Sequence, residues 1–307
     1  MLFSCAPQEL PVPKQDQGEL LTSEVFLGEN YDYQIYYSLR ENKVIQKNLK
    51  TSWDIGFETS PDGYQVILNS SKLMFAYHTG KNDFQSVSDT LGFENGKLSD
   101  VSSGNLDSTA IGDWRNEQPV YILDRGATIA GRLGFVKLQI LHVDDQKYEV
   151  RFKILPHGEE STIVVPKDNQ YNFSYLSFEK GGQIPIVQPP KTEWDLCFTQ
   201  YTVQMAIPYL VTGVLTNSYN TEAQKDSITE FALIDREFIE HTPLSHANDV
   251  IGYGWKHYEL NADNYLVNPL INYLIKTQDG NYFKLHFIDY YNNEGVKGNP
   301  KWEFDRL

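Results

Sequence analysis

The side chains best suited to metal binding or proton transfer are the seven histidines of this sequence. Three of them, His241, His246 and His257, lie in one stretch between predicted strands, beside Tyr253 and Trp255. No histidine belongs to a His-Glu-x-x-His pattern, and the sequence contains no Gly-x-Ser-x-Gly, Walker or Gly-x-Gly-x-x-Gly motif. The sequence therefore favours a binding protein over an enzyme.

The stretch 50–57 occurs again at 191–198, and both copies read Lys-Thr-x-Trp-Asp-(Ile/Leu)-x-Phe. Apolar residues alternate through each copy, which predicts a half-buried strand. We expect the indoles to pack in the core and each aspartate, on the opposite face, to cap a turn or pair with a lysine. These predicted structural residues are Trp53, Asp54, Trp194 and Asp195.

The two copies belong to a longer duplication, because further pairs of segments match in the same order. One pair places Trp114 opposite Trp255, and both are predicted to be structural. The matching segments are 31–38 with 171–177, 111–115 with 251–256, 136–140 with 283–287, and 148–150 with 302–304. We expect two related β units, residues 29–156 and 170–307, joined by residues 157–169 and preceded by a flexible tether over residues 1–28.

The predicted fold is mainly β, with two homologous antiparallel units and one short helix in the second. Turn signals at residues 61–63 and 277–280 predict hairpins. Ser227 followed by Glu230 forms a capping box, and apolar spacing then predicts a helix over residues 227–240.

The formal charge of −15 disfavours nucleic acid, because phosphate binding needs clustered lysine and arginine. No apolar run is long enough to span a bilayer. Residues 2–5, Leu-Phe-Ser-Cys, fit the end of a bacterial lipoprotein signal, although a chance cysteine is the alternative. The pattern predicts a longer native N-terminus, lipidation at Cys5 and a place at the outer membrane or cell surface. A disulfide between Cys5 and Cys197 is left open.

The second unit resembles the HmuY family of Bacteroidetes haem-binding outer-membrane lipoproteins. The resemblance depends on the order of its segments: Tyr175-Leu176-Ser177-Phe178, the strand from Trp194 to Phe198, Thr216-Asn217, the hairpin from Tyr273 to Leu285, and the turn from Gly295 to Gly298. The first unit has the same landmarks in weaker form. The duplication makes this chain longer than a simple member of the family.

This resemblance implies iron acquisition: a haem gripped between loops by two axial side chains, His and sometimes Met, and transfer to an outer-membrane receptor. Under that interpretation, His246 and His257 are the candidate axial ligands, since aromatic residues around them would suit a porphyrin face. His78 and Met205 are the alternatives. The second hypothesis is a surface lipoprotein that uses the same scaffold to bind a glycan or a protein. For the histidines themselves, the simplest interpretation is that they lie in solvated loops.

Overall fold

The computed structural model describes residues 19–307, which form antiparallel sheets joined by turns and short helical segments. The mainly β fold predicted from the sequence is therefore confirmed. Two of the sheets have five strands each. The first has the order β1 (Leu21–Glu24), β21 (Lys297–Arg306), β20 (Tyr282–Tyr291), β19 (Asn272–Lys276), β16 (Glu222–Asp226). The second has the order β12 (Glu160–Pro166), β11 (Lys147–Leu155), β10 (Phe135–Val143), β7 (Val120–Asp124), β6 (Phe75–His78).

Smaller sheets and short helices complete the fold. A four-stranded sheet has the order β15 (Tyr209–Thr216), β14 (Leu196–Val203), β2 (Tyr33–Ser38), β3 (Lys43–Leu49), and a three-stranded sheet has the order β13 (Phe173–Leu176), β4 (Ile55–Glu58), β5 (Val66–Leu68). Two hairpins pair β8 (Ala127–Thr128) with β9 (Gly131–Arg132) and β17 (Lys256–Glu259) with β18 (Asn264–Val267). The α-helices are α1 (Phe93–Gly96) and α2 (Arg236–Glu240), and the 3-10 turns are η1 (Ser70–Lys72), η2 (Phe84–Ser86), η3 (Leu106–Ser108), η4 (Glu179–Gly181) and η5 (Phe231–Leu233).

Alternating side chains explain the long strands. In β11, Tyr148, Val150 and Phe152 are buried while their neighbours are only partly covered, as expected for a strand with one face on the core. The hairpins predicted at residues 61–63 and 277–280 are confirmed, because β4 pairs with β5 and β19 pairs with β20 in antiparallel register.

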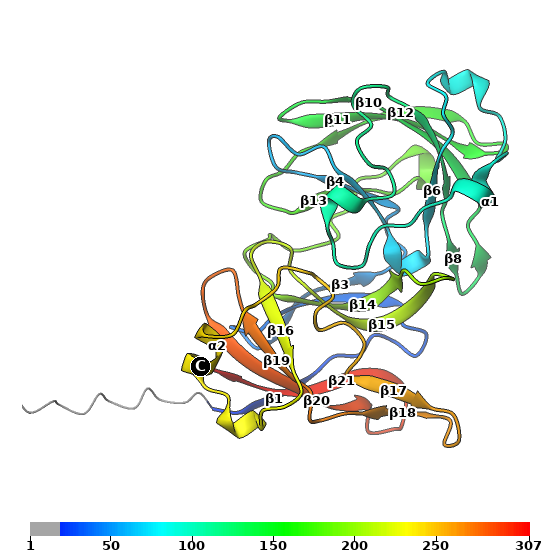
Figure 1. Ribbon diagram of the computed structural model, residues 1–307. Coiled ribbons are helices and arrows are strands. Elements are labelled where there is room, and N and C mark those ends of the chain that lie inside the picture. The colour runs from blue at the N-terminus through cyan, green and yellow to red at the C-terminus, as the bar shows by residue number, and fades with distance from the viewer. Residues whose placement is uncertain (1–18) are drawn as a thin grey trace, which may run out of the picture.

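The strands form two packed bodies, which Figure 1 shows one above the other. One body uses the middle of the chain, and we call it the middle body. It combines the second five-stranded sheet with the three-stranded sheet, around a core that runs from Ile55 to Phe178. The outer body combines the first five-stranded sheet with the four-stranded sheet, around a core drawn from Val25–Leu39 and from Leu196–Phe304. The middle body is continuous in sequence, whereas the outer body uses both ends of the described chain.

The sequence repeats exchange strands between the two bodies. Strand β2 of the first repeat pairs with β14 of the second, which places Tyr37 opposite Leu196. Strand β13 of the second repeat pairs with β4 of the first, which places Leu176 opposite Ile55. Each Trp-Asp strand therefore has one neighbour from its own repeat, β5 for β4 and β15 for β14, and one neighbour from the other repeat. The packed bodies differ in this way from the sequence units 29–156 and 170–307, whose boundaries stay a proposal about the duplication.

Each five-stranded sheet contains a buried lysine, and the two lysines occupy equivalent positions in the two repeats. Lys137 in β10 and Lys284 in β20 are only 4% and 5% exposed. An ammonium group in such surroundings needs hydrogen-bond acceptors. Each one donates to two carbonyls of the connection packed over its sheet: Lys137 Nζ to Phe84 and Val87, and Lys284 Nζ to Phe231 and Ile234.

The helix predicted over residues 227–240 is wrong in its extent, since only Arg236–Glu240 is α-helical. Its cap is Asp235, whose side chain accepts a hydrogen bond from the first turn, and not the predicted Ser227. Lys284 takes two carbonyls that a longer helix would use for its own hydrogen bonds. The first repeat also contains a short helix, α1, which was not predicted.

The equivalent tryptophans Trp114 and Trp255 are buried in the two bodies. Trp114 is 2% exposed and its Nε1 donates to Tyr64 O at 2.9 Å. Trp255 is fully buried, stacks on Phe287 with ring centroids 3.9 Å apart, and donates from Nε1 to Gly252 O at 3.2 Å. Both indoles therefore satisfy their polar group locally while filling the core.

Candidate functional site

The duplicated Trp-Asp strands are fixed by one asparagine each, at equivalent places in the two repeats. Asn69 Nδ2 donates to Lys50 O and Trp53 O, and Asn217 Nδ2 donates to Lys191 O and Trp194 O. These bonds hold each indole against a tyrosine of the other repeat. The edge-on ring pairs are Trp53 with Tyr175, with centroids 4.6 Å apart, and Trp194 with Tyr36, with centroids 4.9 Å apart.

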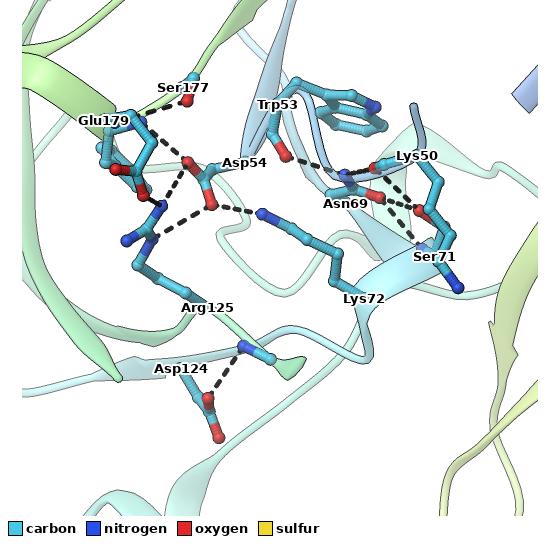
Figure 2. A network of polar contacts seen from close by, with 12 residues as sticks. Lys50, Trp53, Asp54, Asn69, Ser71, Lys72, Asp124, Arg125, Ser177 and Glu179 are labelled. Carbon is cyan, nitrogen blue, oxygen red and sulfur yellow. Dashed lines mark hydrogen bonds and ion pairs between the residues drawn. The ribbon is translucent and has the colours of Figure 1, made fainter. Parts of the chain in front are cut away.

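Asp54 lies at the centre of a buried ion network in the middle body (Figure 2). Its carboxylate pairs with Lys72 Nζ and accepts hydrogen bonds from Arg125, each at 3.2 Å. The carboxylate also accepts a hydrogen bond from Phe178 N at 2.8 Å, and Arg125 reaches Glu179 at 2.6 Å. Burial raises the pKa of Asp54, but Lys72 and Arg125 outweigh it and hold that pKa below its usual range. The network joins β4 to the turn after β13.

Asp195 occupies the equivalent place in the second repeat but has different surroundings. Its Oδ2 accepts a hydrogen bond from Leu39 N at 2.8 Å, as Asp54 does from Phe178 N. The nearby Arg40 pairs with Asp279, at 3.0 Å, instead. Asp195 is 2% exposed, and burial raises its pKa to about 6.

We expect Asp195 to make the free energy of unfolding fall as the pH rises from about 4 to about 6. The unfolded carboxyl loses its proton near the ordinary value of 3.8, whereas the folded one keeps its proton until about 6. In that window the folded state binds more protons, so stability decreases with rising pH, by up to about 1.4 kcal/mol per pH unit. Urea unfolding across this window should show a shallower decline for Asp195→Asn than for the wild type. A difference between the two proteins that stays constant with pH would contradict this expectation.

Three adjoining pockets lie where the two bodies meet, and we call them together the interbody cleft. Their volumes are about 460, 120 and 130 Å³, and all three are lined by Ile67 and Asn248. The loop at residues 103–106 contributes to the wall from the middle body, and residues 246–248 contribute from the outer body. The two loops are tied together by the hydrogen bond from Asn248 N to Ser103 O, at 2.8 Å.

His246 lines the largest pocket of the interbody cleft, together with Ile67, Leu106 and Phe173. Its side chain is 73% exposed, and its Nε2 lies 3.7 Å from Glu222 Oε1. This separation is too long for a hydrogen bond, and the two side chains form an ion pair only when the imidazole is protonated.

His257 lies elsewhere, on the exposed side of β17 opposite Leu266, and it lines none of the three pockets of the cleft. The structure does not bring the two candidate histidines to one pocket. The alternatives are also outside the cleft: Met205 is 61% exposed, and His78 Nδ1 accepts a hydrogen bond from Gly80 N. Cys5 lies outside the described residues.

The sequence did not single out most of the cleft lining. Phe173 and Ile67 carry the alternation of ordinary strands, and the loop at residues 103–106 contains no motif that indicates a ligand. They become neighbours of Asn248 through contacts between the bodies, which local patterns do not encode. Among residues 19–307, no group of three or more His, Cys, Asp or Glu side chains is arranged to hold a metal ion.

The fold and the cleft define a structural class: an antiparallel β protein of two intertwined repeats with pockets where its two bodies meet. The family model described as HmuY protein matches residues 30–150 and, a second time, residues 169–304. The chain belongs to the HmuY family. The resemblance seen in the sequence is therefore confirmed, and the two matches follow the duplication.

Solved structures similar to this chain include apo PinO from Porphyromonas gingivitis and the apo HmuY analog from Tannerella forsythia. Both are 10% identical to it, with TM-scores of 0.28 and 0.27. The matches cover 94% and 95% of this chain, and 97% and 99% of the respective structures. No curated protein matches the sequence. Within residues 19–307, no helix has the length and apolar character needed to cross a membrane.

Proposed function

We propose that this protein binds haem in the interbody cleft, with His246 as an axial ligand to the iron, and passes the haem to an outer-membrane receptor. The observation that carries the proposal is the position of His246 on the wall of a pocket of about 460 Å³ between the two bodies. Membership of the HmuY family gives this pocket its candidate ligand. Lipidation at Cys5, which would hold the protein at the cell surface, belongs to the same proposal.

The pocket has the chemistry that a porphyrin needs. Ile67, Leu106 and Phe173 offer apolar surface, and the imidazole of His246 offers a nitrogen for the iron. When bound, haem would supply the iron centre, and this chain would supply the ligand and exclude water from part of the macrocycle. The described lining of this pocket contains no second histidine and no methionine, so we expect one protein ligand to the iron.

Haemin titration, with absorbance read in the Soret region, tests this proposal. We expect a saturable Soret shift for the wild type and an altered spectrum with at least about tenfold weaker binding for His246→Ala, since even loss of a hydrogen-bond partner of a metal ligand costs about that much. His257→Ala is the matched control, because its imidazole lies outside the cleft, and it should behave as the wild type. Binding should also weaken in acid, because only the neutral imidazole ligates iron.

Two outcomes would contradict the proposal. A Soret shift that survives His246→Ala and changes in His78→Ala or Met205→Ala would move the ligand away from the cleft. No saturable shift at all would favour the second hypothesis, a surface protein of the same family with a ligand other than haem.

A further inference from the structure

The pocket of about 130 Å³ in the interbody cleft lies where equivalent segments of the two repeats meet. Residues from corresponding positions line it in pairs, so the duplication itself builds the site. We call it the paired pocket, and its equivalent residues are Tyr36 with Tyr175, Trp53 with Trp194, and Ile67 with Leu215.

The lining of the paired pocket is polar but uncharged. None of its described residues is an Asp, Glu, Lys, Arg or His. Amide and hydroxyl side chains stand among the aromatic rings instead, from Gln34, Gln188, Ser70, Ser218 and Asn248. The Gln34 amide nitrogen and the hydroxyls of Ser70 and Ser218 donate no hydrogen bond to any residue within 19–307. A neutral ligand with several hydrogen-bonding groups suits such a wall, whereas a charged group would be buried without a partner.

One buried donor of the paired pocket has no partner. Trp53 Nε1 donates to Gln34 Oε1 at 2.9 Å, but Trp194 Nε1 is buried and makes no hydrogen bond within the described chain. The strand pairing explains the difference, because the position of Gln34 on β2 corresponds to Phe173 on β13. A phenyl ring cannot accept the bond that the amide accepts. Trp194 is 5% exposed, and buried N–H groups without partners are rare in native proteins, so this donor lacks an acceptor that a ligand could provide.

We propose that the paired pocket binds one neutral sugar ring, with a ring or hydroxyl oxygen accepting the hydrogen bond of Trp194 Nε1. The hydroxyl groups of a sugar pair with the free amide and hydroxyl side chains, and its C–H surface packs against the aromatic rings. This site goes beyond the haem proposal: it uses a neighbouring pocket, a different ligand class and no histidine.

The direct test is a titration of the ¹⁵N-labelled protein with glucose, galactose and N-acetylglucosamine, following the indole N–H resonances by NMR. The sequence has five tryptophans, so five such signals are expected, and Trp194→Phe assigns one of them. The Trp194 signal should move downfield in a saturable way with at least one of these sugars. Trp302 Nε1 provides an internal control, because it is also without a partner but lies in the core of the outer body, and its signal should not move.

Two comparisons separate specific binding from a general effect of solute. Glucuronate has the same ring as glucose with one added carboxylate, and the uncharged lining should exclude it. Phe173→Gln would give Trp194 Nε1 the acceptor that Gln34 gives Trp53, so the sugar should bind about tenfold more weakly, the loss expected for one hydrogen bond. The far-ultraviolet circular dichroism and thermal midpoint of this variant check that it folds.

The proposal fails if the Trp194 signal of the wild type does not shift with any of the three sugars, or if glucuronate shifts it as strongly as glucose. It also fails if Phe173→Gln folds and binds the sugar as the wild type does. These outcomes are independent of haem, which is read in the Soret region and depends on His246. A protein that binds haem but no sugar, or sugar but no haem, would therefore identify which proposal is wrong.

Discussion

Replacing Asp54 with asparagine is expected to lower the free energy of unfolding by about 3–5 kcal/mol, the usual loss when one member of a buried ion pair is removed. The side chains of Lys72 and Arg125 are only 1% and 6% exposed, and asparagine would leave both cations without a counter-ion. Glu179 cannot replace the Asp54 carboxylate, because its side chain is 58% exposed and contacts only one of the two cations, Arg125.

Asp195→Asn is the matched control for this prediction, since it makes the same change at the equivalent position of the other repeat. Asparagine can still accept the hydrogen bond from Leu39 N, and no cation is left unpaired. Because the buried carboxylate of Asp195 destabilises the folded state once it ionises near pH 6, we expect this variant to be at least as stable as the wild type at neutral pH. Urea unfolding of the two variants and the wild type measures the difference. Equal losses in both variants would show that the network around Asp54 contributes no more than an ordinary buried hydrogen bond.

The local elements of the fold could be predicted because their signals are local. Alternation marked the two Trp-Asp strands, the turn at residues 277–280 marked a hairpin, and the repetition of the Trp-Asp segment marked the duplication. The pairing of those elements could not be predicted, because both repeats carry the same pattern on the strands before and within the Trp-Asp segment. From the sequence alone, Tyr37 could lie opposite Ile55 of its own repeat or opposite Leu196 of the other repeat. The structure pairs Tyr37 with Leu196.

The extent of the helix and the lining of the cleft could not be predicted, for related physical reasons. The spacing of apolar residues after Ser227 was helical, but Ile228 is 94% exposed. Lys284 binds the carbonyls of Phe231 and Ile234, and the α-helix begins only at Arg236. His246 was noticed only because its residue type can ligate a metal. The rest of its pocket, such as Phe173 and Leu106, comes from elements that are distant in sequence and have no chemical motif of their own.

Because the repeats exchange strands, fragments of this chain that are cut at different boundaries are expected to differ in whether they fold. A fragment of residues 50–190 should fold alone, since it retains both sheets of the middle body, including the pairing of β13 with β4. It also keeps Asp54 together with both of its cationic partners and Glu179. A fragment of residues 29–156, the first sequence repeat, should not fold cooperatively. It lacks β12 and β13, leaves one edge of β4 unpaired, and keeps β2 without β14.

Thermal unfolding followed by near-ultraviolet circular dichroism distinguishes the two fragments, which are of similar length. We expect one cooperative transition for residues 50–190 and no transition for residues 29–156, because a body without its closing strands cannot bury enough apolar surface to offset the loss of chain entropy. The opposite result, with residues 29–156 cooperative and residues 50–190 not, would mean that each repeat folds on itself. In that case the Trp-Asp strands would pair within their own repeats, and the paired pocket, which needs Tyr36 beside Trp194 and Tyr175 beside Trp53, would not form.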